Sequence, residues 1–289
     1  MHLQTLVLLL STGLSSTAQP VIPAGAILNA GSFATPGQPH YGVAQGSVFA
    51  VFGTGLGPTT PLQASQYPLP GAQGLAGTSL RLTVGGVSGD ALMLYTSASQ
   101  LLAILPSDTP TGDGTFTVTY QGQTSAPSPV RVVAASFGIF TRSANGRGRA
   151  IVQNVQANGD LLLNDLTESA HPGETVVLWG TGLGRVSGDE AAGPLPGPNF
   201  NPQIYVGGQF VNAAYAGRSG CCAGVDQISF AIPDNVFGCY VPLAVGTGAT
   251  GTGNVVGNYA TISLTQSGKT CTDSGISSDA LTGLDSLGT

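Results

Sequence analysis

Hydrophobic and polar residues alternate with a period of two along most of the chain, which is the pattern of half-buried β-strands. The alternating segments are short and are bounded by Gly, Pro, Asp and Ser. Short strands at close spacing, with turn residues between them, predict an all-β fold built as a sandwich. The predicted strands are 47–53, 79–86, 116–122 and 129–133, followed by 175–180, 203–208, 227–233, 240–246 and 259–266.

The two groups of strands are copies of one pattern. GSVFAVFGTGLG, which starts at Gly46, lies over GETVVLWGTGLG, which starts at Gly173, at a shift of 127 residues. QLLAILP at 100–106 lies over QISFAIP at 227–233 at the same shift, and VGG occurs in both copies at a shift near 122. Each copy has the size of one immunoglobulin-like domain of about 100 residues. The sequence therefore predicts tandem immunoglobulin-like β-sandwiches joined by a β-hairpin segment.

The segment between the copies contains Asn158-Gly159 between apolar stretches, the usual mark of a tight hairpin turn. We expect 150–163 to form a two-strand ribbon that joins or braces the sandwiches. The alternative interpretation, a calcium loop in NVQANGD, lacks the several carboxylates that such loops use. The expected organisation is a signal peptide at 1–18, a first domain at 19–134, a connecting segment at 135–169, a second domain at 170–272 and a polar tail at 273–289, in which a Ser-capped helix is expected.

The repeated GTGLG string raises the question of a phosphate-binding loop. Such a loop needs a helix directly after its glycines, because the helix N-terminus holds the phosphate. Gly57 is followed by PTTPLQASQYPLP and Gly184 by RVSGDEAAGPLPGP, and neither segment can form that helix. These glycines are therefore predicted to turn strands, and no cofactor site is assigned.

Composition narrows the function classes. Charged residues make up 8% of the chain, and the net charge is −6. Nucleic-acid binding needs a basic stripe. The nearest candidate is a Gly-rich loop with Arg142, Arg147 and Arg149, which we interpret as a solvated turn. The 44 Gly and 19 Pro residues disfavour long helices and agree with many short strands.

The first 18 residues predict export. An apolar run at 6–10 leads through small residues to Ala18, which fits a cleavage site, although no Lys or Arg precedes the run. No later segment has the roughly 18 unbroken apolar residues of a transmembrane helix. Four cysteines, an even number, fit two disulfides in an oxidising compartment, and four cysteines allow three pairings. Zinc is disfavoured because Cys221 and Cys222 are adjacent rather than spaced.

The order Gly, strand, GTGLG, VGG and QIxxxxP resembles the IPT/TIG type of immunoglobulin-like domain. The chain from about 27 to 272 also resembles a family of secreted, chiefly acidobacterial proteins known as an uncharacterised C-terminal domain. The resemblance rests on both GTGLG strands and on the stretches ILNAGSF at 27–33, FGIFT at 137–141, YAGRSGCCAGVDQISFAIP at 215–233 and GCYVPLAV at 238–245. It implies the fold and export, and it implies no activity.

The same resemblance implies an adjacent Cys221–Cys222 disulfide and a second disulfide between Cys239 and Cys271. The expected placement of Cys239 and Cys271 at neighbouring ends of the last hairpin agrees with this pairing. A long-range pairing such as Cys222 with Cys239 stays open.

Candidate catalytic groups are few. The chain after the predicted signal has two histidines, His40 and His171, each just before the first strand of its repeat. No G-x-S-x-G nucleophile elbow is present, and a Ser-His-Asp triad would have to be assembled by the fold. We therefore assign no catalytic residue and no metal ligand.

Two residues beside the Cys-Cys loop are candidate ligand contacts, Tyr215 and Asp226. Asp226 occurs only in the second copy, where the first copy has Ser99. The structural alternative is that Asp226 caps a turn or accepts hydrogen bonds from backbone amides. Trp179 aligns with Phe52, and a core position is the expected interpretation for both.

Three functions stay open on this basis. The first is a secreted, non-catalytic structural or adhesive protein that contacts another surface protein or associates with itself. The second is a carbohydrate-binding module for extracellular polysaccharide, which exposed aromatic residues around 210–226 would favour. The third is a hydrolase that uses His171 or His40. No nucleic acid is expected as a partner.

Overall fold

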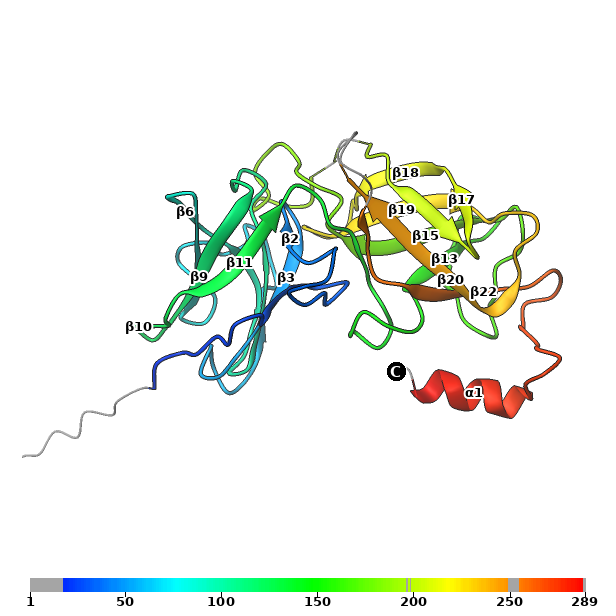
Figure 1. Cartoon of the computed structure of the whole chain (residues 1–289), viewed down its shortest axis with the longest axis horizontal. Coiled ribbons are helices and arrows are strands. Elements are labelled where there is room, and N and C mark those ends of the chain that lie inside the picture. Colours follow the sequence, from blue (N-terminus) through cyan, green and yellow to red (C-terminus); the bar gives the residue numbers. More distant parts are fainter. Residues whose placement is uncertain (1–17, 196, 198, 249–254, 288–289) are drawn as a thin grey trace, which may run out of the picture.

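The computed structural model describes residues 18–195, 197, 199–248 and 255–287, and nearly all of its regular structure is β-sheet. The strands form two sandwiches that lie side by side along the long axis of the molecule (Figure 1). The predicted all-β fold is confirmed. Of the predicted signal peptide, only Ala18 lies among the described residues.

The first sandwich consists of two sheets whose inner faces carry the alternating apolar residues. Its core includes Phe49 and Phe116, both fully buried, whose ring centroids are 5.0 Å apart. One sheet has the order β1 (Ile27–Asn29), β3 (Val48–Phe52), β8 (Gln100–Ile104), β7 (Leu92–Thr96) and β4 (Leu62–Gln63). The other has the order β2 (Val43–Ala44), β11 (Ser128–Val133), β9 (Gly112–Tyr120), β5 (Thr78–Val84) and β6 (Val87–Asp90), with β10 (Gln123–Thr124) beside β9.

The second sandwich repeats this arrangement around a separate core that contains Phe137 and Phe230. One sheet has the order β14 (Leu161–Leu163), β13 (Val152–Val155), β15 (Thr175–Thr181), β19 (Asp226–Ala231) and β18 (Ala213–Arg218), with β12 (Gly138–Ile139) also on β15. The other has the order β17 (Gln209–Val211), β16 (Gln203–Val206), β20 (Gly238–Thr247) and β21 (Val255–Val256), with β22 (Ala260–Leu264) also on β20.

Strand register shows that the duplication holds residue by residue. Val48 pairs with Ile104 in the first sandwich, and Thr175 pairs with Ala231 in the second, so both partners are displaced by 127 positions. The VGG hairpins agree as well. Gly85 and Gly86 have φ of 56° and 81°, and their counterparts Gly207 and Gly208 have 57° and 82°. Two successive residues with positive φ are what a tight two-residue hairpin turn requires, and glycine adopts them without strain.

The segment 135–169 does not stand apart as a connector. The expected hairpin forms, with β13 and β14 antiparallel and Gly159 in its turn at φ 88°. However, β13 also pairs with β15, as Val152 lies opposite Leu178, so the hairpin extends a sheet of the second sandwich. In the first sandwich Ile27 lies opposite Val51 in the same way. The pairing with β15 is not evident from the sequence, because the second copy lacks the ILNAGSF motif at this strand.

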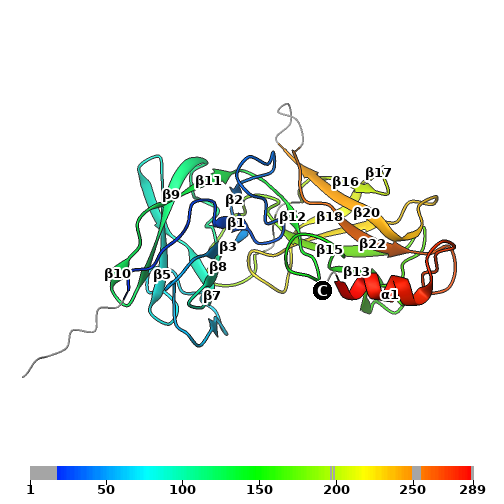
Figure 2. The same cartoon turned by 60° about the horizontal axis from the view of Figure 1, so that its bottom comes forward.

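The chain ends in the helix α1 (Ser278–Leu287), which lies along the lower side of the second sandwich (Figure 2). The Ser277 Oγ accepts a hydrogen bond of 3.2 Å from the Ala280 amide, which caps the helix as predicted. Leu281 is buried in a small cluster with Leu166 and with Cys239 and Cys271, which form a disulfide with a Cα–Cα distance of 5.5 Å. This disulfide joins β20 to the segment just before the helix.

Replacing both Cys239 and Cys271 with Ser should lower the free energy of unfolding by about 3–4 kcal/mol, because the bond restricts a long loop in the unfolded chain. Denaturant unfolding measures this change. The control is the Cys221→Ser/Cys222→Ser variant, whose bond joins neighbouring residues and restricts little chain entropy. Equal losses in the two variants would contradict the loop-entropy account.

Candidate functional site

A pair of opposite charges lies buried where the two sandwiches meet. Arg218 ends β18 and Asp226 begins β19, and the two residues lie opposite each other in the sheet. Their side chains are 2% and 0% exposed, and Arg218 Nη1 donates to Asp226 Oδ1. Charges are rarely buried this completely unless each is paired and hydrogen-bonded. We call the contacts around this pair the interdomain joint.

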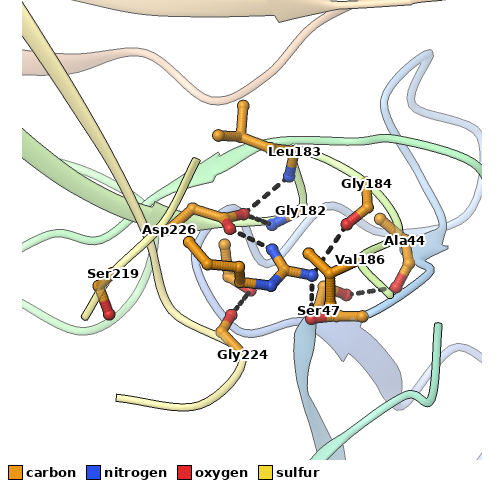
Figure 3. A network of polar contacts seen from close by, with 12 residues as sticks. Ala44, Ser47, Gly182, Leu183, Gly184, Val186, Ser219, Gly224 and Asp226 are labelled. Atoms are coloured by element: carbon orange, nitrogen blue, oxygen red, sulfur yellow. Dashed lines mark hydrogen bonds and ion pairs between the residues drawn. The ribbon is translucent and has the colours of Figure 1, made fainter. Parts of the chain in front are cut away.

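The carboxylate of Asp226 also organises the second GTGLG loop. Its Oδ2 accepts hydrogen bonds from the amides of Gly182 at 2.7 Å and Leu183 at 2.8 Å (Figure 3). Burial raises the pKa of the Asp226 carboxyl, and the Arg218 guanidinium and the two amides oppose that rise. The loop thus binds an anion, as glycine loops often do, but the anion is a side chain of the same domain.

Arg218 connects this loop to the first sandwich. Its Nη2 donates to the Gly184 carbonyl at 2.8 Å and to the Gly46 carbonyl at 2.7 Å. Gly46 lies in the turn before β3, and a side chain there would collide with Arg218 Nη2 and with Ser107 Oγ. One guanidinium group therefore ties a carboxylate, its own domain and the neighbouring domain together.

Hydroxyl groups extend the joint on both sides of Arg218. Thr181 Oγ1 accepts from the Val48 amide at 2.8 Å and donates to the Gly224 carbonyl at 2.7 Å. Ser107 Oγ accepts from the Val186 amide and donates to Glu190 Oε1, each at 3.0 Å. Burial raises the pKa of Glu190, and its hydrogen bonds from Ser107 oppose that rise.

The third sequence element of the joint is the ILNAGSF stretch. Asn29 Nδ2 donates to the Ser136 carbonyl at 3.0 Å, and its Oδ1 accepts from the amides of Gly31 at 2.8 Å and Ser32 at 3.0 Å. Gly31 lies so close to the backbone of Gly138 that a side chain would not fit. The first strand of the chain is thereby fixed to the start of the second sandwich.

Apolar packing completes the contact between the domains. Ala223 from the β18–β19 loop packs in a buried cluster with Val48, Leu69 and Ile104 of the first sandwich. Gly224 has φ 72°, and a Cβ there would come within 2.9 Å of both Val48 and Ile104. The exposed Cys221–Cys222 disulfide closes the tip of this loop.

The two candidate ligand contacts, Tyr215 and Asp226, lie inside this network. Asp226 is fully buried and its oxygens are used by Arg218, Gly182 and Leu183, so it faces no external ligand. Tyr215 is half-buried, and its hydroxyl donates to the Arg218 carbonyl at 2.7 Å. The structural alternative for Asp226, hydrogen bonding to backbone amides, describes what the carboxylate does.

Sequence reasoning singled out Asp226 but missed Arg218. In the first sandwich Leu101 pairs with Thr96, as Ile228 pairs with Ala216 in the second, so Ala98 and Ser99 occupy the places of Arg218 and Asp226. A charge pair present in one copy only, in a chain with few charges, was the available signal. Nothing in the sequence showed that Arg218 reaches Gly46.

The histidines are held in turns. His171 Nδ1 lies 3.0 Å from Glu174 Oε1, and its Nε2 lies 2.7 Å from the Gly268 carbonyl, so both ring nitrogens have partners. Burial lowers the pKa of His40. Trp179 is half-buried, and its indole Nε1 donates to Gln153 at 2.8 Å. Among the described residues, no three His, Cys, Asp or Glu side chains are grouped to hold a metal ion.

Comparison with solved structures gives distant likenesses. No protein-family model and no curated protein matches the chain. Domains 5–6 of the S-layer protein SbsC align with 14% identity and a TM-score of 0.24 over 84% of this chain and 99% of that one. The FN1–FN3 domains of chicken CNTN1 align with 12% identity and a TM-score of 0.21 over 86% and 67%. At such low TM-scores these neighbours say nothing about what this chain binds. In the described part of the chain, no helix is long and apolar enough to cross a membrane.

Replacing Arg218 with Met should lower the free energy of unfolding by about 3–5 kcal/mol, because it leaves the Asp226 carboxylate buried without its partner. Urea unfolding measures the loss. The control is Arg81→Met, which removes an exposed partner 3.2 Å from Asp90 and should cost about 0–1 kcal/mol. Similar losses in both variants would contradict a central role for the buried pair.

Stability should also depend on the protonation of His171. The hydrogen bond to Glu174 and the Gly268 carbonyl raise the pKa of His171 above 6.5 in the folded state. The stability that protonated His171 contributes is complete at pH values below the pKa of this histidine in the unfolded chain. It is lost as the pH rises through the higher pKa of the folded state. Unfolding free energies should therefore fall over that window in the wild type and fall less in His171→Gln. Identical pH profiles would exclude this linkage.

Proposed function

We propose that the chain is a secreted, non-catalytic structural or adhesive protein whose two sandwiches work as one rigid element. The observation that carries the proposal is the buried guanidinium of Arg218, which reaches from the second sandwich to the Gly46 carbonyl of the first. Domains in one chain usually move relative to each other unless their interface is large and apolar. A buried ion pair that reaches across is a different solution, because separating the domains would break the hydrogen bonds from Arg218 to Gly46 and from Val48 to Thr181.

Other features of the chain support an extracellular structural role. Two disulfides fit an oxidising compartment, and one of them clamps the end of the second sandwich. Polar residues that are mostly uncharged cover the surface, as charged residues make up only 8% of the chain. A fixed angle between two domains lets a protein transmit force or hold a spacing between attachment points.

The proposal is tested by measuring the assembly and the adsorption of the purified, oxidised protein. Concentrated alone, the protein should assemble into larger particles, whereas saturable adsorption to insoluble cellulose, chitin, xylan or peptidoglycan would favour the polysaccharide-binding candidate described next. Depletion measurements and sedimentation detect both. A monodisperse monomer that adsorbs to none of these polymers and does not assemble would contradict the proposal.

Polysaccharide binding is a second candidate because two aromatic rings are exposed on one end of the second sandwich. Phe210 is 53% exposed, and Phe237, which is 56% exposed, lines a groove of about 470 Å³ with Gln209 and Ile276. Aromatic faces are suited to stacking on ligand rings. Phe210→Ala/Phe237→Ala should then abolish adsorption to one polysaccharide, whereas Tyr259→Ala, which removes another exposed ring, should not. Unchanged adsorption in the double variant would exclude this candidate.

A further inference from the structure

The edge strand β14 of the second sandwich consists of three consecutive exposed leucines. Leu161, Leu162 and Leu163 are 43%, 39% and 40% exposed. Successive side chains of a strand point to opposite faces, so this strand presents apolar surface on both faces of the sheet. It stands at the end of its sheet, with β13 on its inner side.

The outer backbone edge of β14 is also available. The Asn164 amide donates to the Val152 carbonyl, and the Gln156 amide donates to the Asp160 carbonyl. Because hydrogen-bonded pairs alternate along antiparallel strands, the N–H and C=O groups of Leu162 point inward, toward Asn154 of β13. The N–H and C=O groups of Leu161 and Leu163 therefore point outward, where they can pair with another strand.

Natural proteins usually protect such an edge with charges, proline or bulges. Several other edge strands carry polar residues, for example Gln63 in β4, Asp90 in β6 and Gln209 in β17, although the two-residue strands β2 and β21 carry none. β14 also carries no polar residue, and its three leucines are exposed, whereas many other leucines of the chain lie in the cores. A strand with this composition fits a partner strand that is equally apolar and uncharged.

We propose that β14 pairs antiparallel with β14 of a second copy of this chain, about a two-fold axis at Leu162. This inference rests on the proposed structural role and names the partner for one of its surfaces. Leu161 of one copy lies opposite Leu163 of the other, and both exchange their outward N–H and C=O groups. The two second sandwiches then share one continuous sheet.

The strand is complementary to itself in this register. Asp160 lies opposite Asn164 of the second copy, and Asp165 lies opposite Gly159, so no like charges face each other across the pair. The leucines cover one another on both faces of the sheet. A register shifted by one residue would direct the outward backbone groups of one strand to inward groups of the other, and it would lose these hydrogen bonds.

The paired segment is short, well below a standard interface of about 1,600 Å². We therefore expect a weak, concentration-dependent dimer rather than a permanent one. Weak pairing suits an assembly in which many copies contribute contacts.

Sedimentation equilibrium of the full oxidised chain tests the proposal. The wild type should show a monomer–dimer equilibrium at high micromolar concentration, and Leu162→Lys should weaken it at least tenfold. The control Val87→Lys changes an exposed apolar residue on the edge strand β6 and should dimerise like the wild type. Circular dichroism checks that both variants are folded. Dimerisation of Leu162→Lys at wild-type strength, or a wild type that stays monomeric, would overturn the proposal.

Cross-linking tests the register. Residues that face each other across a non-hydrogen-bonded antiparallel pair have Cα atoms about 4.5 Å apart, within the range of a disulfide. Leu162→Cys should therefore cross-link to itself on oxidation. Leu161→Cys should cross-link with Leu163→Cys in a mixture, and much less with itself. Equal yields for all three combinations would exclude the two-fold register.

The failure of this inference can be told apart from the failure of the proposed function. If the wild type assembles into larger particles and Leu162→Lys does so equally, the β14 contact is wrong and the structural role stands. If the wild type neither assembles nor adsorbs, both are wrong.

Discussion

The arrangement of the molecule depends on one buried ion pair. Arg218 and Asp226 face each other across two strands of the second sandwich, and between them they satisfy the GTGLG loop of their own domain and the Gly46 carbonyl of the first domain. Burying two charges is costly unless they are paired and fully hydrogen-bonded. Displacement of the domains would leave the pair intact within the second sandwich, but it would break the hydrogen bond from Arg218 to the Gly46 carbonyl.

The ion pair also distinguishes the two copies of the repeat. The two copies share their strand register and their VGG turns, but only the second has Arg218 and Asp226. In the second copy the glycine loop supplies amides to a carboxylate, whereas the corresponding positions of the first copy are Ala98 and Ser99. The second copy thus provides the guanidinium group, and the first copy provides the Gly46 carbonyl that accepts its hydrogen bond. The two copies therefore differ at the end of this hairpin, where the second copy carries Arg218, Asp226 and the longer loop between them.

Much of the fold could be predicted from the sequence because its signals are local. Alternation of apolar residues fixes strands, paired glycines fix the hairpins at Gly85 and Gly207, and Ser277 caps α1. The place of β13 could not be predicted, because its pairing with β15 depends on residues more than 20 positions away and its motif differs from that of β1. The interdomain joint was even harder to predict from the sequence. Arg218 and Gly46 are 172 residues apart, and neither residue type alone indicates a contact.

A distance measurement between the two sandwiches tests the central claim most directly. Spin labels at Val87→Cys and Gln209→Cys lie on corresponding hairpins of the two domains, and double electron–electron resonance gives the distribution of distances between them. A rigid joint predicts a single narrow distribution that stays the same in high salt, since a buried pair is screened little. A broad distribution, or one that changes with salt, would contradict the account.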